Sequence, residues 1–534
     1  MTAEIELKLA IDPVAVAATV SALQRHPAVA GLKRGRWHRA QVTSTYFDTP
    51  DWQLAAAGLA LRVRRYGERW LQTVKGPPLP DAGGGLHARA EYEWPVAGPR
   101  LDPVRLATTP WRRLLGDAIA GNLLAPRFTT DFERRATALS FADGSRAELC
   151  IDVGEIRVDG RRRPAGKAAA KRAVIAEVEI ELKTGSPTPM FELAQALVGD
   201  LPLVVATASK AERGLALVRG RPDGWSAPLR ARPVPPAPGT AAADALRAIA
   251  LECLQQIAAN AAGLLADDDP EWVHQMRIGT RRLRACLALA VRHLPRAAIE
   301  PQMVELKWLA GILGIARDWD VFASETVATF AAQATADPAR FPEIRRLRAR
   351  VAARRNAARA AARAAVRSPR FQQLVLGVGR LCSAPPTAGA APGGKNADDD
   401  PPRVKAFSRK VIERRHRRLV RRASACTPGT PEARHALRIA AKKLRYAAEF
   451  FAPQPQGKRA RGYIQALAGL QDVLGRGNDA VTAARLAALV TLGDDDPAAA
   501  ALRDWIAARG AATVPLLAPA WARFAAARRF WNSH

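Results

Sequence analysis

The sequence has few cysteines, no long apolar run and no phosphate-binding glycine loop. Its five cysteines are odd in number and never spaced as CxxC, which argues against a disulfide framework and a zinc site and fits reduced cytosolic thiols. No apolar run reaches the roughly 18 residues that span a bilayer, and no apolar signal segment precedes the first charged strand. We therefore expect a cytoplasmic protein without membrane contact. The absence of GxxxxGK[ST] argues against a P-loop NTPase.

Positive charge is abundant and unevenly placed. The 534 residues carry a formal net charge of +31. Residues 1–220 hold 31 Lys and Arg against 24 Asp and Glu, a net +7, and the remainder holds 50 against 26, a net +24. A basic C-terminal part predicts a polyanionic partner there, although part of this charge can be a solvated face.

The first strand, residues 4–9, alternates charged and apolar residues. As a β-strand it places Glu4, Glu6 and Lys8 on one face and apolar residues on the other. The pattern returns at residues 177–183, where four charges share a face. Because neighbouring carboxylates repel one another unless a cation lies among them, two such strands meeting would form a metal site.

Further strands are predicted between these two. They cover residues 41–48, 59–66, 70–75, 89–94, 127–139 and 147–153, with helices at about 13–23 and 105–120. Gly67-Glu68 predicts a hairpin turn. Each strand alone fits an antiparallel sheet with one wet face. Together they carry acidic and basic groups on the face they share, which suits a closed barrel that holds an anion and metals.

An ordered set of motifs in residues 1–219 resembles the CYTH family, the triphosphate tunnel metalloenzymes. The set comprises Glu4-x-Glu6-x-Lys8, Tyr46-Phe47-Asp48-Thr49, Leu61-Arg62-Val63-Arg64, Thr73-Val74-Lys75, Glu177-x-Glu179-x-Glu181-x-Lys183 and Ser209–Gly214. The basic, Ala-rich stretch 161–172 departs from the family and looks like an inserted loop.

This resemblance implies an antiparallel tunnel of eight strands, with Mg²⁺ or Mn²⁺ on inward carboxylates and triphosphate on inward cations. The implied metal ligands are Glu4, Glu6, Glu91, Glu93, Asp152, Glu177, Glu179 and Glu181. The implied phosphate ligands are Lys8, Arg62, Arg64, Lys75, Arg89, Arg134, Lys183, Lys210 and Arg213. Of these, Glu4, Glu6, Lys8 and Lys75 are the expected catalytic residues. Phosphoanhydride hydrolysis needs such groups to spread phosphoryl charge and present water.

Residues 220–240 are rich in Pro and Gly and predict a linker. Beyond it the pattern is helical, and an internal repeat appears with an offset of 435 − 274 = 161 residues. It relates 273–284 to 434–445, and then Asp318 to Asp479. A register kept over some 45 residues indicates duplication.

Each copy of the repeat carries a basic stripe on one helical face. His274, Arg277, Arg281 and Arg284 fall in one arc with Arg282 beside it, and apolar residues lie opposite. The second copy repeats this pattern. A solvated amphipathic helix is the simpler interpretation, but the duplication and the lack of acidic i+4 partners favour an anion-binding surface.

Residues 241–520 resemble the CHAD family, which implies a pair of pseudo-symmetric helical bundles that bind inorganic polyphosphate. A loop at about 383–402 separates the halves. His274 and His435 are interpreted as hydrogen-bond donors to phosphate, since they lack the spacing of a metal-binding pair within one helix. The expected polyphosphate ligands are His274, Arg277, Arg281, Arg282, Arg284, His435, Arg438, Lys442, Lys443 and Arg445.

The sequence thus predicts an α+β multidomain protein, a CYTH domain at 1–219 and a CHAD domain at 241–520. The expected activity is metal-dependent hydrolysis of inorganic triphosphate. Three alternatives stay open: a non-enzymatic polyphosphate-binding or granule-associated protein, a CYTH enzyme acting on thiamine triphosphate or ATP, and a nucleic-acid-binding module. The third is disfavoured because no aromatics interleave the basic stripe.

Overall fold

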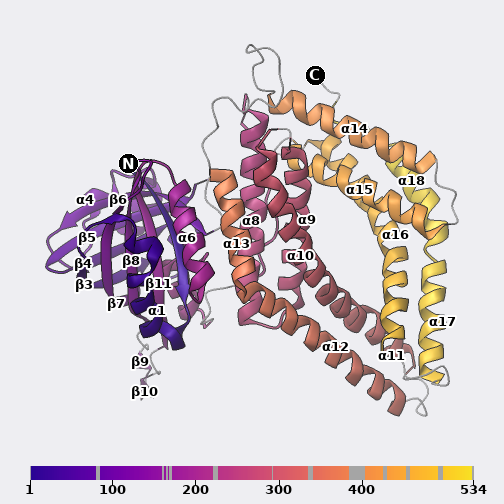
Figure 1. The fold of residues 1–534 in the computed structure, drawn as a ribbon, viewed down its shortest axis with the longest axis horizontal. Helices are drawn as coiled ribbons and strands as arrows, with labels where there is room; N and C mark the ends of the chain where they lie inside the picture. Colours follow the sequence, from indigo (N-terminus) through magenta and orange to yellow (C-terminus); the bar gives the residue numbers. More distant parts are fainter. Residues whose placement is uncertain are drawn as a thin grey trace. The chain divides into compact units, whose positions relative to one another are not determined.

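The computed structural model describes residues 2–79, 85–158, 162–163, 166–167, 171–220, 227–237, 239–291, 293–334, 341–383, 403–424, 430–452, 457–490 and 497–531. Its contacts divide the chain into two compact units (Figure 1). One contains Met1–Arg230, Ala250–Met276 and Val366–Gly389, and the other contains Ala231–Ile249, Arg277–Ala365 and Ala390–His534. The expected domain boundary at 219–241 stays a prediction.

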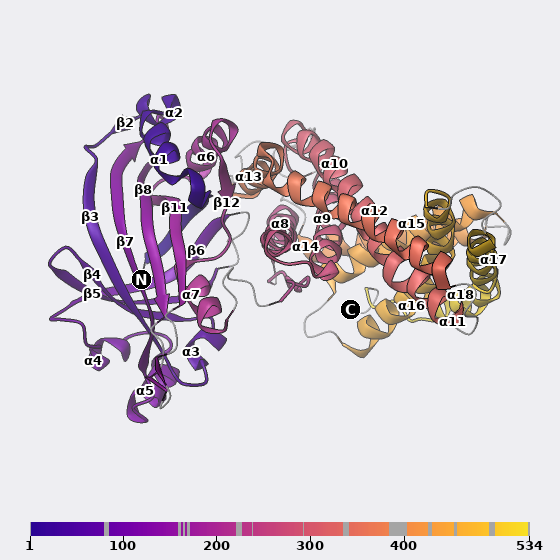
Figure 2. The ribbon, with the colours of Figure 1, turned by 90° about the horizontal axis from the view of Figure 1, so that it is seen from below.

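The first unit is built on a closed barrel of eight antiparallel strands (Figure 2). Around the barrel the strands follow the order β1, β6, β5, β4, β3, β7, β8, β11, and β11 returns to β1. Their bounds are β1 (Thr2–Ile11), β3 (His38–Asp48), β4 (Ala60–Tyr66), β5 (Arg69–Pro78), β6 (Leu86–Val96), β7 (Ala125–Ser140), β8 (Arg146–Val158) and β11 (Lys171–Thr184). The predicted eight-stranded tunnel is confirmed.

The two acidic strands meet, as the alternation predicts. In the antiparallel pair β1–β11, Glu6 lies opposite Glu181 and Lys8 opposite Glu179. Because side chains alternate between faces, this register puts the charged residues of both strands inside the barrel and the leucines and isoleucines outside. The predicted hairpin is present too: Tyr66 pairs with Arg69 across a two-residue turn, and Gly67 has a φ of +61° there.

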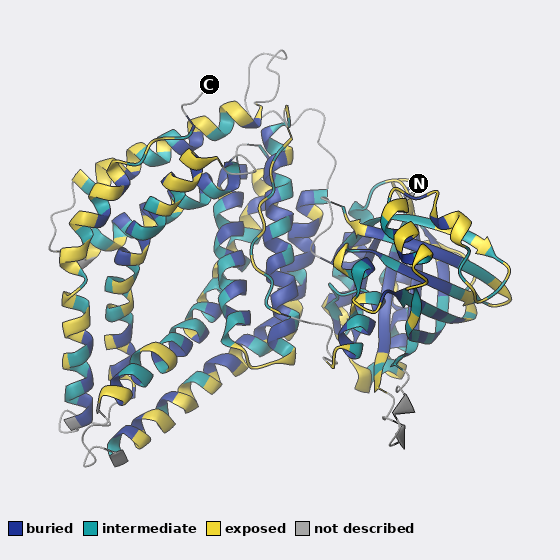
Figure 3. Cartoon of the chain, turned by 180° about the vertical axis from the view of Figure 1, so that it is seen from behind, coloured by how far each residue is buried: buried dark blue, intermediate teal, exposed yellow. Residues whose placement is uncertain are grey.

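Short helices cover the outside of the barrel and bury its apolar face in two cores. One core joins Leu7 and Leu9 of β1 to Leu197 of α6, and the other joins Leu61 and Val74 to α3–α5. The bounds are η1 (Pro13–Ala15), α1 (Val16–Arg25), α2 (Pro27–Ala30), α3 (Gln53–Ala56), α4 (Pro103–Leu106), α5 (Arg112–Ala120) and α6 (Thr188–Asp200). Figure 3 shows the barrel strands mostly buried or half-buried.

Minor strands extend the barrel. β2 (Lys33–Arg34) pairs with β7, and β12 (Leu203–Val205) pairs with β1. β9 (Arg162–Arg163) and β10 (Gly166–Lys167) form a ribbon of their own within the stretch expected as an inserted loop.

Helix α7 (Lys210–Val218) packs against the inner rather than the outer face of the barrel wall. Its Leu217 joins a core with Phe128, Phe132, Ile156 and Ile175. The last three share the inner face with Arg134, Asp152 and Glu177, which lie two or four residues away on the same strands. Gly214 permits this approach, since a Cβ there would lie 2.1 Å from the Phe128 ring. The helix therefore closes part of the interior and carries Lys210 into it.

A helix far along the chain packs on the same unit. α13 (Pro369–Ser383) places the buried Leu376 in the core of β1 and α6. The Gln372 side chain accepts a hydrogen bond from the Val205 backbone N–H at 2.9 Å and donates to the Val366 carbonyl at 2.7 Å. A segment of the helical part is thus integral to the covering of the barrel.

The remaining helices show the predicted repeat in their bounds. α9 (Pro270–Ala290) and α15 (Pro431–Phe451) begin and end with a shift of 161 residues. α8 (Ala242–Ala266) corresponds to α14 (Val404–Ser424), and α10 (Arg296–Val321) to α16 (Lys458–Ala488). The others are η2 (Phe322–Val327), α11 (Ala328–Ala334), α12 (Phe341–Arg367), α17 (Pro497–Ala511), η4 (Val514–Leu516) and α18 (Leu517–Ala525).

Several sequence expectations concern composition and loops. Cys150, Cys253, Cys286 and Cys382 are buried thiols, which fits the expected reduced cysteines, and Cys426 lies outside the described residues. Residues 384–402 of the expected loop and 221–226 of the expected linker also lie outside the described residues.

Helix α8 is long and apolar enough to be a candidate for a membrane span, with a mean hydropathy of 1.3 over its most apolar window. However, 72% of that window is buried within the protein, as in a core helix.

The close packing of α7 gives a test of the fold. Gly214→Ala should lower the free energy of unfolding by about 1–3 kcal/mol, the usual cost of overpacking, because the new methyl group must displace α7 from Phe128. The matched control is Gly311→Ala in α10, where no atom lies within 4 Å of the added Cβ. This control should be neutral or slightly stabilising. Urea unfolding of both variants compares the two, and equal stability would contradict the packing.

Candidate functional site

The interior of the barrel is lined by charged side chains of both signs. They come from β1, β4, β5, β6, β7, β8 and β11, with Lys210 and Arg213 added by α7. Buried ions are stable only when paired and hydrogen-bonded, so the pairing shows how this lining is held.

Three buried carboxylates form the centre of the lining, and we call Asp152, Glu177 and Glu179 the acid triad. Each offers an oxygen within 4.8 Å of the others. Asp152 lies opposite Glu177 in the β8–β11 register, and Glu179 is two residues further along the same inner face. Three carboxylates so close together are a suitable ligand set for a hard divalent cation.

Three basic side chains neutralise the acid triad, and we call Lys8, Arg134 and Lys210 the tunnel cations. Lys210 Nζ lies 2.7 Å from Asp152 Oδ2 and 2.9 Å from Glu179 Oε1, and it also bonds Glu177. Arg134 makes a bidentate bond to Asp152 at 2.8 and 2.7 Å and contacts Glu179. Lys8 bonds Glu179 and lies 3.0 Å from Glu6. Each triad carboxylate therefore has a cationic partner.

Titration behaviour reflects this pairing. Burial alone would raise the pKa of Glu179, but the charges of Lys210, Lys8 and Arg134 hold that pKa well below its usual value. Burial would likewise lower the pKa of Lys8, and the Glu179 and Glu6 carboxylates instead raise it well above its usual value. These groups stay ionised in the interior, so charges of both signs are available there.

A second group of charges lies further along the barrel wall. Lys75 bonds Glu4, and its Nζ is 3.6 Å from Glu91. Arg62 also lies 3.6 Å from Glu91, and its guanidinium donates a hydrogen bond to the Tyr46 hydroxyl of β3. Burial and the Glu91 and Tyr46 partners fix this arginine against the wall. The two groups give the tunnel successive acidic and basic positions along its length.

Other expected ligands occupy less buried positions. Glu93 is exposed and accepts a hydrogen bond from Thr73 at 2.9 Å. Lys183 pairs with Glu181 at 2.6 Å and lies 3.6 Å from Glu148. Their exposure puts them nearer to solvent than the acid triad.

The last expected phosphate ligands also contact protein carboxylates or other arginines. Arg213 Nη1 lies 3.3 Å from Glu177 Oε2, and Arg89 lies 2.8 Å from Glu212. Arg64 is near Arg62 and Arg134, and burial together with these charges lowers its pKa. A guanidinium held among other guanidiniums favours a bound anion.

Sequence reasoning missed three residues of this lining. Tyr46 holds Arg62, Glu148 faces Lys183, and Glu212 both pairs with Arg89 and completes the capping box at the start of α7. The alternation in residues 147–153 is a signal from which Glu148 could have been found. Tyr46 and Glu212 could not be found without knowing which strands and helices meet.

In the helical part, the two basic stripes contribute to one cluster. Burial and mutual repulsion lower the pKa values of Arg277 and Arg438, with Arg281 among the repelling charges. Burial and the charges of Arg281, Arg438 and Arg277 lower the pKa of Lys442 to about 7. Four basic groups from α9 and α15 therefore lie within electrostatic reach of one another, and we call Arg277, Arg281, Arg438 and Lys442 the basic cluster.

Two acidic residues face the basic cluster from equivalent positions of the repeat. Asp318 of α10 is half-buried and Asp479 of α16 is more exposed, and partial burial of the carboxyl group raises the pKa of each. Asp479 lies 3.9 Å from Arg438. Among the described residues these two carboxylates do not balance the four bases, so the basic cluster keeps a net positive charge.

The remaining stripe residues separate from the basic cluster. Arg282 and Arg445 both pair with Glu449, at 3.2 and 2.6 Å. The expectation that no acidic i+4 partner interrupts the stripe is therefore wrong for Arg445. Lys443 lies near Arg284 and two arginines of α14, and burial together with these charges lowers its pKa.

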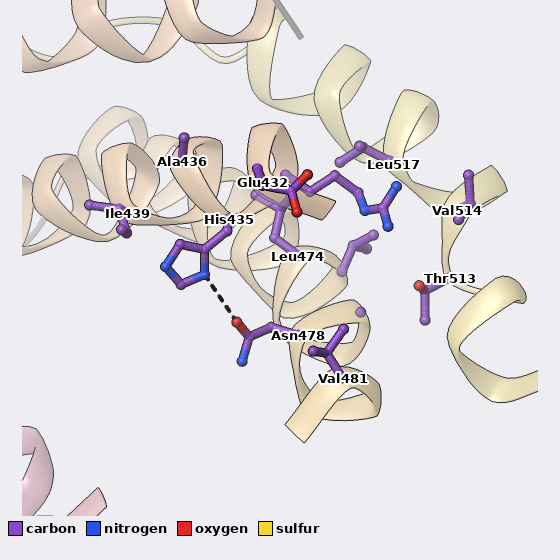
Figure 4. Close-up of a pocket in the computed structure, with 13 residues that line it drawn as sticks. Glu432, His435, Ala436, Ile439, Leu474, Asn478, Val481, Thr513, Val514 and Leu517 are labelled. Atoms are coloured by element: carbon purple, nitrogen blue, oxygen red, sulfur yellow. Dashed lines mark hydrogen bonds between the residues drawn. The ribbon is translucent and has the colours of Figure 1, made fainter. Parts of the chain in front are cut away.

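His435 borders a pocket of about 390 Å³ between α15, α16 and the start of α18 (Figure 4). Its Nδ1 lies 3.2 Å from Asn478 Oδ1. Apolar side chains, Ile439, Val481 and Leu517 among them, form much of the lining. His274 lies on α9 one turn before Arg277, which keeps it on the expected face of that helix.

Two protein-family models match this chain, one for each of its parts. A family model of the CYTH domain matches residues 2–215, and one of the CHAD domain matches residues 248–488. The chain belongs to the CYTH and CHAD families. The two resemblances drawn from its motifs are thereby confirmed.

Individual relatives agree with these CYTH and CHAD matches. Over 223 residues the chain is 29% identical to an inorganic triphosphatase from Haemophilus influenzae, a match that covers 41% of the chain and 55% of the relative. The chain thus spans about half the length of that curated relative.

Solved structures are similar to each domain as well. A CHAD domain from the plant Ricinus communis is 32% identical, with 57% of this chain and 98% of that one covered and a TM-score of 0.47. A putative adenylyl cyclase from Hippeastrum, described as having a dominant triphosphatase activity, is 20% identical, with 40% and 95% covered and a TM-score of 0.28.

The pairing of the acid triad gives a stability test. In metal-free buffer, Glu179→Gln should lower the free energy of unfolding by about 3–5 kcal/mol, the usual cost of removing one partner from buried ion pairs, because all three tunnel cations contact this carboxylate. Glu93→Gln, at an exposed carboxylate of the same barrel, should stay within about 0.5 kcal/mol of the unchanged protein. Equal effects in urea unfolding with EDTA would contradict the pairing.

Proposed function

We propose that the CYTH barrel hydrolyses inorganic triphosphate with a bound divalent cation, Mg²⁺ or Mn²⁺. The observation that carries this proposal is the acid triad set among the tunnel cations inside a closed barrel. Such a site offers ligands to a metal and to a polyanion at adjacent atoms. The triphosphatase relative matched by the barrel supports the same substrate class.

The chain's own residues divide the work of this reaction. Asp152, Glu177 and Glu179 would hold the metal, which supplies charge neutralisation and an activated water when bound. Lys8, Arg134 and Lys210 have the charge to bind phosphoryl oxygens and to stabilise the charge that spreads over them in the transition state.

The second group of charges would hold the rest of the substrate. Arg62 and Lys75 are placed to bind the other phosphates, with Tyr46 and Glu91 fixing their positions. Glu4 and Glu6 add negative charge beside Lys75 and Lys8. They are the expected further metal or water ligands.

A phosphate-release assay tests the reaction. With Mg²⁺ or Mn²⁺ the protein should release phosphate from triphosphate faster than from thiamine triphosphate or ATP, and addition of EDTA should stop it. Glu6→Gln should reduce turnover by about 100-fold or more, as loss of a group supporting a metal can. Glu133→Gln, the same change on the outer face of β7, should leave turnover unchanged. Near-normal turnover of Glu6→Gln at saturating metal would contradict the role of Glu6.

We also propose that the CHAD part binds inorganic polyphosphate through the basic cluster, and that the protein acts in the cytoplasm, where it can associate with polyphosphate granules. Two helices related by the repeat each contribute two bases, so one flexible polyanion can contact both copies. The opposing Asp318 and Asp479 leave the cluster with excess positive charge.

The pKa of Lys442 makes this binding dependent on pH. With a pKa of about 7 in the free protein, Lys442 is charged below neutral pH and loses its proton as the pH rises. A bound polyanion favours the charged form, so affinity should be highest near pH 6 and fall by up to about tenfold per pH unit above pH 7. Isothermal titration with long-chain polyphosphate from pH 6 to pH 9 measures this.

Two variants separate this effect from general loss of charge. Lys442→Arg stays charged and should bind with little dependence on pH, whereas Lys405→Arg, at an exposed lysine of α14, should behave like the unchanged protein. Single-stranded DNA of equal charge serves as a competitor. Affinity that is flat with pH in the unchanged protein would remove Lys442 from the site, and equal competition by DNA would indicate generic polyanion binding.

A further inference from the structure

The ammonium group of Lys210 occupies the centre of the acid triad. It contacts all three carboxylates, and only 6% of its side chain is exposed. The ligand oxygens of the triad lie within 4.8 Å of one another. A metal bound to all three oxygens would need the position that this ammonium fills, so Lys210 and the metal compete for the same ligands.

The backbone of Lys210 is fixed while its side chain is long. Lys210 is the first residue of α7, directly after the capping box in which the Ser209 hydroxyl accepts from the Glu212 N–H and the Glu212 carboxylate accepts from the Ser209 N–H. Gly214 holds the same helix against Phe128. The flexible four-carbon stem of Lys210 lets its ammonium change position while helix α7 stays in place. The planar guanidinium of an arginine would have less freedom to do so.

Charge balance opposes either ligand binding alone. The acid triad contributes three negative charges and the tunnel cations contribute three positive charges. A divalent cation alone would add two unbalanced positive charges to a buried site, and a polyphosphate anion alone would have to compete with the triad for the same cations. When both enter, the metal takes the carboxylates and the released cations take the anion.

We propose that Lys210 is an exchange residue that couples the binding of metal to the binding of anion. It neutralises the acid triad when the tunnel holds no metal, and it turns to a phosphate oxygen when a metal replaces it. Metal and triphosphate then favour each other's binding, and the coupling is reciprocal. This inference rests on the proposed function of the barrel, and it adds the prediction that Lys210 weakens metal binding while it strengthens anion binding.

Two measurements with one ligand each test the exchange, and neither requires turnover. Lys210→Met should bind Mn²⁺ without anion more tightly than the unchanged protein, by roughly 5- to 150-fold, the usual range of a coupling between sites. Electron paramagnetic resonance of free Mn²⁺ measures this. In EDTA, the same variant should bind triphosphate more weakly by isothermal titration, because one phosphate-binding charge is lost.

The matched control is Lys33→Met, at an exposed lysine of β2 that belongs to neither the acid triad nor the expected ligand sets. It should leave Mn²⁺ affinity unchanged. If Lys210→Met proves unfolded by circular dichroism, Lys210→Gln carries the same two expectations, since its amide can still donate to the triad but has no charge.

The outcomes separate the exchange from the proposed function. Unchanged or weaker Mn²⁺ binding in the Lys210 variant would overturn the exchange, while hydrolysis of triphosphate by the unchanged protein would still stand. Tighter Mn²⁺ binding would support the exchange even if the phosphate-release assay showed a different substrate. Equal gains in Mn²⁺ affinity in Lys210→Met and Lys33→Met would show only a general effect of charge and would also overturn the exchange.

Discussion

The structure of the barrel depends on the neutralisation of buried charge. Eight strands bring acidic and basic side chains into one closed interior, where an unpaired ion would cost several kcal/mol. The acid triad and the tunnel cations satisfy each other there, and Lys75, Glu4, Glu91 and Arg62 form a second balanced group. The charges that stabilise the barrel are also of the kind that a metal and a polyphosphate would bind. Under the proposed function, stability and binding use one set of groups, and ligands would have to replace the internal partners.

The helical part handles charge in a different way. Among the described residues fewer carboxylates than bases face its basic cluster, and burial together with mutual repulsion lowers the pKa values of Arg277, Arg438 and Lys442. A bound polyanion would reduce this repulsion. Duplication explains how it arose: helices of equal length, α9 and α15, bring the same basic spacing to it from two copies. The barrel thus has balanced charge and the helical basic cluster has unbalanced charge, although both are proposed to bind polyphosphates.

Much of the barrel could be predicted because period-two alternation is local. A strand with Glu4, Glu6 and Lys8 on one face has few other ways to fold, and the same pattern at residues 177–183 indicated its partner. The position of α7 could not be predicted, because its packing on the inner wall depends on Gly214 meeting Phe128, a contact between distant segments. The docking of α13 on the barrel is likewise non-local. In the helical part the stripe was visible, but Glu449 lies outside the matched segment and its pairing with two arginines was missed.

In the proposed mode of binding, a metal and a triphosphate enter the barrel together and replace the internal ion pairs of the acid triad. A crystal structure with Mn²⁺ and a triphosphate analogue that has nitrogen bridges between its phosphates would show this exchange of partners. Anomalous scattering should place manganese among Asp152, Glu177 and Glu179, with Lys210 turned to a phosphate oxygen. Manganese outside the barrel, with Lys210 still bonded to the three carboxylates, would contradict the account.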